Sequence, residues 1–255
     1  MTFEISTHLA LILILVAFVA GFVDAIAGGG GLLTMPALLL AGADPVQALA
    51  TNKLQGTFGS GTAMLTYARA GQVNLRDQAV MAAISVTAGA GGALVAHLVP
   101  VDLLRLIMPV VLVLVALFFA LKPGLGDASS TPRLPPAVFA ATAVPLIAAY
   151  DGFFGPGAGS FFMIGFVTLA GYGVLKATAH TKLLNFASNA GSLAVFASSG
   201  AVWWAVGLAM GAAQVAGARL GAGVALRCGA RLIRPLLVIS CTGMALRLLW
   251  EALPG

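Results

Sequence analysis

The sequence predicts an all-helical integral membrane protein, and three observations lead to that fold class. Hydrophobic residues make up 60% of the 255 residues, charged residues only 8%, and the mean hydropathy is +1.03. A soluble domain carries about 25% charged residues, so this chain cannot build a surface that faces water on every side. Lipid must therefore cover most of the outside, and in lipid a helix satisfies its own backbone.

The second observation is the division of the apolar residues into ten segments, at 9–27, 31–42, 45–68, 78–98, 103–121, 135–150, 158–171, 174–198, 202–225 and 232–250. A full span needs about 20 residues, so 31–42 and 158–171 are expected to be half-helices or broken helices. We therefore expect about eight full spans and two short or broken helices.

The first segment is expected to be retained as a helix. Its apolar run resembles a signal-peptide core, but Glu4 and no Lys or Arg precede it, and the run continues to Ala27. The stretch 122–134 is hydrophilic and rich in Pro, Gly and Ser, which is typical of a linker.

The third observation is an internal repeat with an offset of 129 positions. At this offset Lys53-Leu54 matches Lys182-Leu183, and Gly28 and Gly30 match Gly157 and Gly159. We therefore expect a first repeat over residues 1–127 and a second over 128–255. The alternative is a duplicated bundle that transports nothing.

The basic residues predict the orientation of the repeats. They gather at Arg69 and Arg76, at Lys122 and Arg133, at Lys176, and at Arg227, Arg231 and Arg234. All of these fall in the cytoplasm if the chain starts outside and crosses ten times, so both termini are predicted to be periplasmic. The two five-segment repeats are then inverted, which is typical of secondary transporters.

The remaining composition excludes several functions. The net charge of +5 fits cytoplasmic loops of a membrane protein, and no basic stripe or aromatic platform suggests nucleic-acid binding. Cys228 and Cys241 have no metal-ligand spacing and are interpreted as small hydrophobic residues. No P-loop, catalytic set, metal site or cofactor site is found, so we expect no enzyme.

Two glycine clusters, 28–31 and 155–159, are expected to interrupt helices inside the membrane. The next helix would then present free N–H groups and a positive dipole end, which attract anions. Gly30, Gly31, Gly159 and Ser160 are therefore predicted to bind an anionic substrate. The alternative is close helix packing through small residues.

Lys53 and Lys182 lie well inside apolar segments, where a lysine costs about 2.5–3.5 kcal/mol. That cost at two equivalent positions suggests a use, and we predict that both lysines bind the anion. Snorkelling or a structural ion pair is the alternative. Asn52, Asn185 and Asn189 lie close by in sequence and are expected to hydrogen-bond the same substrate.

A third set of residues is assigned to coupling or gating. Asp24 and Asp151 each precede a glycine cluster and could couple protons or sodium ions, or could equally be counter-ions of the lysines or helix caps. Arg219 lies within the Gly217-to-Gly221 spacing and Gln214 lies one turn before it, and such a spacing more often packs helices than binds substrate.

Long motifs resemble a known family. GFVDAIAGGGGLLTMPALLLAG and ALATNKLQGTFGS are similar to the first repeat of the TauE/SafE (TSUP, sulfite exporter-like) permeases, in their YfcA-like branch, and YDGFFGPGAGSF and KATAHTKLLNFASNAGS to the second. The resemblance covers the whole chain. It implies a permease of the bacterial inner membrane that moves sulfite or a related sulfur-containing or organic anion.

The expected mechanism is alternating access, with export as the favoured direction. Uptake of a carboxylate or sulfonate with H⁺ or Na⁺, and a non-transporting assembly or sensor module, are the alternatives. The expected partners are the lipid bilayer and a small anion, with a homodimer left open.

Overall fold

The computed structural model describes residues 7–104, 110 and 131–229, and these residues form helices and no strand. In chain order the helices are α1 (Thr7–Ala27), α2 (Gly30–Leu40), α3 (Pro45–Arg69), α4 (Ala79–Leu98), α6 (Pro136–Ala141), α7 (Ala143–Phe153), α8 (Ala158–Thr168), α9 (Val174–Ser198) and α10 (Trp204–Cys228). The predicted segment 232–250 and nearly all of 103–121 lie outside the described residues.

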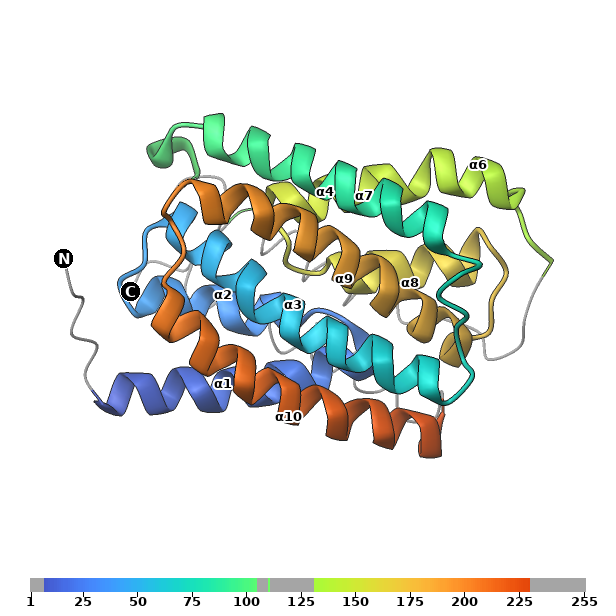
Figure 1. The fold of residues 1–255 in the computed structure, drawn as a ribbon, viewed down its shortest axis with the longest axis horizontal. Coiled ribbons are helices and arrows are strands. Elements are labelled where there is room, and N and C mark those ends of the chain that lie inside the picture. Colours follow the sequence, from blue (N-terminus) through green and yellow to red (C-terminus); the bar gives the residue numbers. More distant parts are fainter. Residues whose placement is uncertain (1–6, 105–109, 111–130, 230–255) are drawn as a thin grey trace.

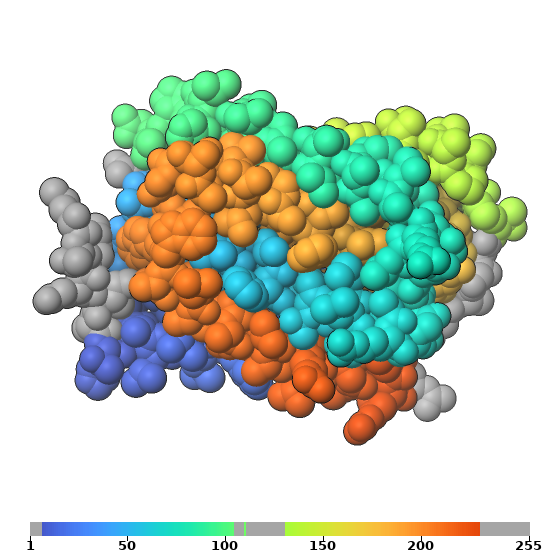
Figure 2. All heavy atoms as spheres, in the orientation of Figure 1, coloured from blue at the N-terminus to red at the C-terminus, as the bar shows by residue number. Residues whose placement is uncertain are grey.

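The long helices run side by side along the longest axis of the molecule (Figure 1). Helices α1 and α10 pack together along one side, and α4 and α7 along the other, while α3 and α9 lie between these two pairs. The short helices α2 and α8 pack against α3 and α9 respectively. On the face drawn in Figure 2, α3 is flanked by α9 and α10.

Three stretches of the described chain are long and apolar enough to cross a membrane: α1, α4 and the α6–α7 stretch Pro136–Phe153. Helices α3, α9 and α10 have 25 residues each and so are about 37 Å long at 1.5 Å per residue. Many of the polar residues of these three helices are buried inside the bundle, and they lower the mean hydropathy of the helices. Helices α2 and α8, with 11 residues each, are too short to span, as predicted.

The glycine clusters interrupt the chain as the sequence predicted. Gly28 and Gly29 have φ values of +82° and +84°, and Gly155 and Gly157 have +93° and +82°. Only glycine adopts this left-handed region readily, so α1 ends before the first pair and α7 before the second. A new helix then begins at Gly30 and at Ala158.

The predicted segment 135–150 is two helices, α6 and α7, and not one. The interruption lies at Thr142, whose φ and ψ are −119° and −67°. Pro145 explains it, because proline has no N–H to donate to the carbonyl of Ala141. The stretch Pro136–Phe153 is therefore a helical segment whose backbone hydrogen bonds are interrupted at Thr142.

Glycines allow the two outer helix pairs to pack closely. A Cβ added to Gly92 of α4 would lie 2.0 Å from the carbonyl oxygen of Ala149 in α7. A Cβ added to Gly221 of α10 would lie 2.3 Å from the carbonyl oxygen of Phe22 in α1. The backbones thus touch where a side chain would not fit, as in other membrane helix pairs.

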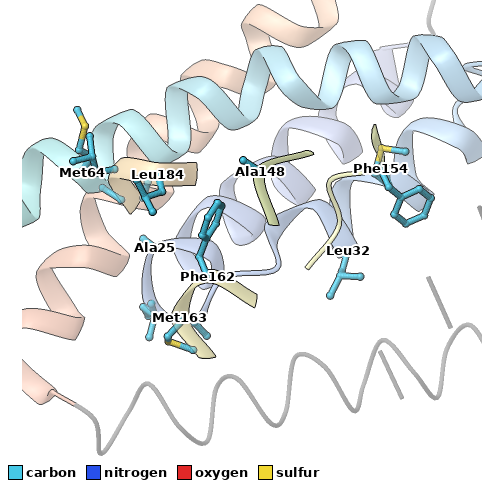
Figure 3. Close-up of a cluster of buried hydrophobic side chains, with 14 of the residues drawn as sticks. Ala25, Leu32, Met64, Ala148, Phe154, Phe162, Met163 and Leu184 are labelled. Carbon is cyan, nitrogen blue, oxygen red and sulfur yellow. The ribbon is translucent and has the colours of Figure 1, made fainter. Parts of the chain in front are cut away.

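The apolar side chains divide between an inner core and a lipid-facing surface. Figure 3 draws part of the core, in which Phe162 and Met163 of α8 lie among buried side chains from α1, α2, α3, α7 and α9. Large apolar side chains are also exposed, Leu11 and Leu15 on α1 and Leu146 on α7 among them. Exposure of this kind suits contact with lipid tails and not with water.

Candidate functional site

The two helix interruptions meet inside the bundle. The Ser160 hydroxyl at the start of α8 donates a hydrogen bond of 3.0 Å to the carbonyl of Ala27 at the end of α1. A Cβ on Gly28 would lie 2.5 Å from the backbone nitrogen of Ser160. The two breaks can therefore come together only because residue 28 has no side chain.

Two buried ion pairs flank this meeting point, and each joins one half of the chain to the other. Lys53 of α3 lies 2.6 Å from the carboxylate of Asp151 in α7. Lys182 of α9 lies 2.9 Å from the carboxylate of Asp24 in α1. Both lysines are at most 1% exposed, so each is neutralised by its carboxylate and not by water.

The Asp151 carboxylate is fully occupied by its neighbours. Its Oδ1 atom accepts from Lys53, whose ammonium also donates to the Asp151 backbone carbonyl. Its Oδ2 atom accepts from Asn185 Nδ2 at 3.0 Å and from the Ser188 hydroxyl. With three side-chain donors among the described residues and 2% exposure, this carboxylate is almost fully enclosed.

Within the described part of the chain, the Asp24 carboxylate has fewer donors than that of Asp151, and it is more exposed. Its Oδ1 atom accepts from the backbone N–H of Gly30, the first residue of α2, at 3.1 Å. Its Oδ2 atom accepts from Lys182. The side chain is 15% exposed, and Asp24 lies in the last turn of α1, directly before the break.

A small polar cavity of about 30 Å³ lies between these pairs. Its lining comes from both breaks and from the helices around them: Asp24, Gly29, Gly30, Gly31, Asn52, Gly56, Asp151, Gly155, Gly157, Gly159, Asn185, Asn189 and Gln214. A water molecule needs roughly 10–15 Å³ by this measure, so the cavity has room for about two waters or one small ion.

Asn52 is oriented so that it offers a donor to the cavity. Its Oδ1 atom accepts from the Thr34 hydroxyl at 2.6 Å and from Gln55 Nε2 at 3.0 Å. The amide nitrogen therefore lies on the other side, 3.3 Å from where a Cβ on Gly31 would be. Among the described residues Nδ2 donates no hydrogen bond, so it is available to a bound solute.

Six of the nine residues predicted to bind substrate line the cavity: Gly30, Gly31, Asn52, Gly159, Asn185 and Asn189. The other three do not. Lys53 and Lys182 each point at a carboxylate that reaches them from the other half, and Ser160 uses its hydroxyl to join the two breaks. The lysines are thus ion-pair partners in this state and not open anion ligands.

Of the four residues predicted to act in coupling or gating, three line the cavity and one does not. Asp24, Asp151 and Gln214 line the cavity, whereas Arg219 is exposed on the outer side of α10. One turn before Arg219, the Gln214 side chain donates to Gln55 of α3 at 3.2 Å. Gly29, Gly56, Gly155 and Gly157 also line the cavity and were not assigned to it from sequence, although three of them belong to the two glycine clusters.

The described residues contain no group of three His, Cys, Asp or Glu side chains that could hold a metal ion. What they provide is a buried polar cavity at the starts of two helices. The two lysines and two aspartates around it balance in charge. Such a cavity can hold a small charged solute and needs no covalent chemistry.

The amino-acid sequence matches a known family of membrane transporters. The family model described as "Sulfite exporter TauE/SafE" matches residues 13–248. "Probable membrane transporter protein ORF9" of a Sinorhizobium species is 56% identical over 246 residues, which are 96% of this chain and 94% of that protein. No solved structure matches the chain.

Two further relatives agree. "Probable membrane transporter protein YfcA" of Escherichia coli K12 is 45% identical over 250 residues, covering 98% of this chain and 93% of that protein. A "Probable membrane transporter protein" of Haemophilus influenzae is 41% identical over 248 residues, 97% of each chain. The chain belongs to the TauE/SafE family, a family of multi-pass membrane transporters and not of enzymes.

Proposed function

We propose that this protein carries sulfite, or a related sulfur-containing or organic anion, across the bacterial inner membrane by alternating access. The observation that carries the proposal is the cavity itself. The cavity lies where the two helix interruptions meet, and several asparagine side chains line it. Beside it are two Lys–Asp pairs, each of which joins one half of the chain to the other. Discontinuous helices whose N-termini point at the site are how many secondary transporters bind anionic groups.

The two halves of the chain are proposed to be inverted repeats. Helices α3 and α9 have the same length, and both their starts and their ends are separated by the offset of the sequence repeat. Contacts repeat at the same offset. Ser85 donates to the carbonyl of Leu184, and their repeat equivalents, Gln214 and Gln55, are also joined by a hydrogen bond.

In each of these two hydrogen bonds a residue of one half contacts the equivalent region of the other half. This supports a two-fold symmetry axis that relates the halves, with the site on that axis. Rocking of one half against the other would then open the cavity to each side in turn. With both termini in the periplasm, the turn after α3 lies in the cytoplasm and the turn after α9 in the periplasm.

The anion would take its hydrogen bonds from groups that have no partner among the described residues. These are Asn52 Nδ2 and the backbone N–H groups of Gly31 and Gly159, in the first turns of α2 and α8. Free N–H groups at a helix start favour negative charge. The cavity also disfavours a non-transporting module, because a purely structural bundle gains from filling such a space.

The direction depends on what crosses with the anion. An anion that leaves alone gains about 2.3 kcal/mol per 100 mV of inside-negative potential, so export needs no other coupling. Uptake requires a cation. A specific observation favours this second candidate: two carboxylates, Asp24 and Asp151, line the same cavity.

The test is anion flux into liposomes that contain the purified protein. Sulfite, sulfate, thiosulfate, methanesulfonate and small carboxylates would be compared as labelled substrates under counterflow. We expect at least one of them to exchange, and Lys182→Ala and Asn52→Leu to reduce that exchange at least tenfold. Normal exchange in both Lys53→Ala and Lys182→Ala would show that the site is misplaced.

A matched control lies on the same helix. Lys176 of α9 stacks over the ring of Tyr172, 4.5 Å from its centroid, and does not line the cavity. Lys176→Ala removes one lysine from α9 without touching the site, so its exchange should equal that of the unmodified protein.

A further inference from the structure

We infer that the Asp24 carboxylate occupies the anion site in this state, and that a monovalent anion displaces it when one proton neutralises it. The inference rests on the proposed function and deepens it, because it names the coupling ion, the coupling residue and the charge of the substrate.

The first step is what Asp24 binds. One of its oxygens accepts from the N–H of Gly30 at the start of α2, at 3.1 Å, and the other accepts from Lys182 at 2.9 Å. A helix start and an intramembrane lysine are the donors that an anionic substrate would be expected to use. A carboxylate of the protein itself therefore holds the position that the substrate needs.

The second step is charge balance. Two ammonium groups, Lys53 and Lys182, face two carboxylates, Asp24 and Asp151, so the pairs around the cavity sum to zero. An anion that entered this balanced site would leave one uncompensated negative charge inside the membrane, which is strongly unfavourable. One proton on one carboxylate restores neutrality when the anion is monovalent. A dianion would leave a negative charge even then.

The third step is which carboxylate takes the proton. Asp151 is 2% exposed and accepts from Lys53, Asn185 and Ser188, so protonating it would disrupt three partners at once. Asp24 is 15% exposed and accepts from two donors among the residues that the structure describes. The Lys53–Asp151 pair is therefore the enclosed, structural one, and the Lys182–Asp24 pair is the more exposed one, whose carboxylate can take up a proton.

Few other charged or titratable groups surround Asp24 in the described part of the chain. Helix α9 contributes Lys182, and α3 contributes Lys53 and Tyr67, whose hydroxyl donates to the carbonyl of Ala25. From α7, Asp151 lines the same cavity. Helices α2 and α8 carry no charged residue, and the charged residues of α10 are Arg219, which is exposed, and Arg227 in its last turn.

The resulting cycle balances. A proton from the open side binds the Asp24 carboxylate, which releases Lys182 and the Gly30 N–H. The monovalent anion takes both donors, and the site is again neutral. After the halves rock, the anion and then the proton leave on the other side, and the carboxylate returns to Lys182. One anion and one proton cross together, so no net charge moves.

This coupling decides the direction. Since no net charge moves, the membrane potential has no effect, and flow follows the sum of the anion and proton gradients. An outside that is more acidic than the inside then drives uptake.

The experiment uses full-length protein in liposomes and a monovalent probe of fixed charge, methanesulfonate, with a small carboxylate as a second probe. Sulfite is avoided here because it takes up a proton itself near neutral pH. An inward proton gradient should drive accumulation of the probe, and entrapped pyranine should report protons that enter with it. A potassium diffusion potential set with valinomycin should not change the rate.

The decisive variant is Asp24→Asn, which keeps an acceptor for the Gly30 N–H but carries no charge and cannot take up a proton. In the unmodified protein the probe should bind more tightly as the pH falls, by up to about tenfold per pH unit, which is the limit for one proton. In Asp24→Asn binding should be tight and independent of pH, accumulation should stop, and the remaining flux should respond to the membrane potential.

Asp44→Asn is the matched control. Asp44 caps α3 through the N–H groups of Val46 and Gln47, and asparagine caps a helix equally well, so the same charge is lost away from the cavity. Its pH dependence should be that of the unmodified protein.

The outcomes separate the two proposals. If no anion in the panel exchanges under any condition, the proposed function fails and this inference fails with it. Exchange without proton uptake, accumulation driven by sodium instead, or an unchanged pH dependence in Asp24→Asn would each overturn the inference and leave the transporter standing.

Discussion

At the level of single residues, the two buried ion pairs consist of the same residue types, a lysine and an aspartate, but their surroundings differ. Lys53 and Asp151 are at most 2% exposed, whereas the Asp24 side chain beside Lys182 is 15% exposed. Breaking a buried pair by removing one charge is far more costly than replacing both partners with apolar residues. The enclosed pair should therefore contribute to folding, and the open pair to transport.

The first prediction tests that division. Asp151→Asn leaves Lys53 charged and unpaired in the bundle, so we expect a loss of about 3–5 kcal/mol of stability. The midpoint of thermal unfolding of the purified protein in detergent should fall clearly. The double variant Lys53→Met/Asp151→Leu, which removes both charges, should recover most of that loss. A single variant that unfolds at the same temperature as the unmodified protein would contradict the structural role of this pair.

A second prediction concerns the turn where the two breaks meet. Gly28→Ala places a side chain 2.5 Å from the Ser160 nitrogen at a φ of +82°. Both the clash and the left-handed backbone are unfavourable for alanine, so we expect anion flux to be lost together with at least about 1 kcal/mol of stability. Gly71→Ala is the control, because residue 71 also has a positive φ of +71° but nothing within 4 Å. Equal flux in the two variants would show that contact at the break is unimportant.

Among the helices, close packing depends on which face of a helix each glycine occupies. Gly92 of α4 contacts α7 and Gly221 of α10 contacts α1, while a Cβ at the nearby Gly91 or Gly223 would meet no described residue within 4 Å. The two contacting positions are equivalent in the sequence repeat, so the same small residue serves corresponding interfaces. A sequence motif alone does not distinguish the contacting glycine from its neighbour.

The third prediction uses these neighbours as matched pairs. Gly92→Ala and Gly221→Ala should each force two backbones apart, at a cost of about 1–3 kcal/mol. Gly91→Ala and Gly223→Ala meet no atom of the described residues within 4 Å and should be neutral or slightly stabilising, since alanine favours the helix. Thermal unfolding of the four variants measures this. Similar losses at the contacting and the open positions would mean that these helices do not pack as described.

For the molecule as a whole, the proposal of inverted halves makes equivalent turns lie on opposite sides of the membrane. Ala70 follows α3 and Ser199 follows α9, both are exposed, and they occupy equivalent positions of the sequence repeat. If the halves ran in parallel, both turns would lie on one side.

The fourth prediction is read by cysteine labelling in intact cells. In a background with Cys228 and Cys241 replaced, Ser199→Cys should react with a membrane-impermeant maleimide. Ala70→Cys should react only after the cells are permeabilised. Labelling of both positions from the outside would rule out the inverted arrangement and the predicted periplasmic termini.

Much of the fold could be predicted from sequence because it depends on local properties. The helices α3 and α9 were predicted to within one residue at either end. The glycine runs at 28–31 and 155–159 disfavour a helix locally, so the two interruptions were also predictable. The break at Thr142 was missed, because Pro145 acts on a segment whose hydropathy shows no interruption.

The sequence by itself determined a membrane-embedded helical protein with two breaks, two intramembrane lysines and a polar stripe, because composition and helix-ending residues act locally. Only the tertiary structure decided that each lysine faces a carboxylate from the other half, and that Asp24 is the one left partly open. Those pairings join residues 98 and 158 positions apart. They depend on how the two helix interruptions dock, and no local pattern encodes that contact.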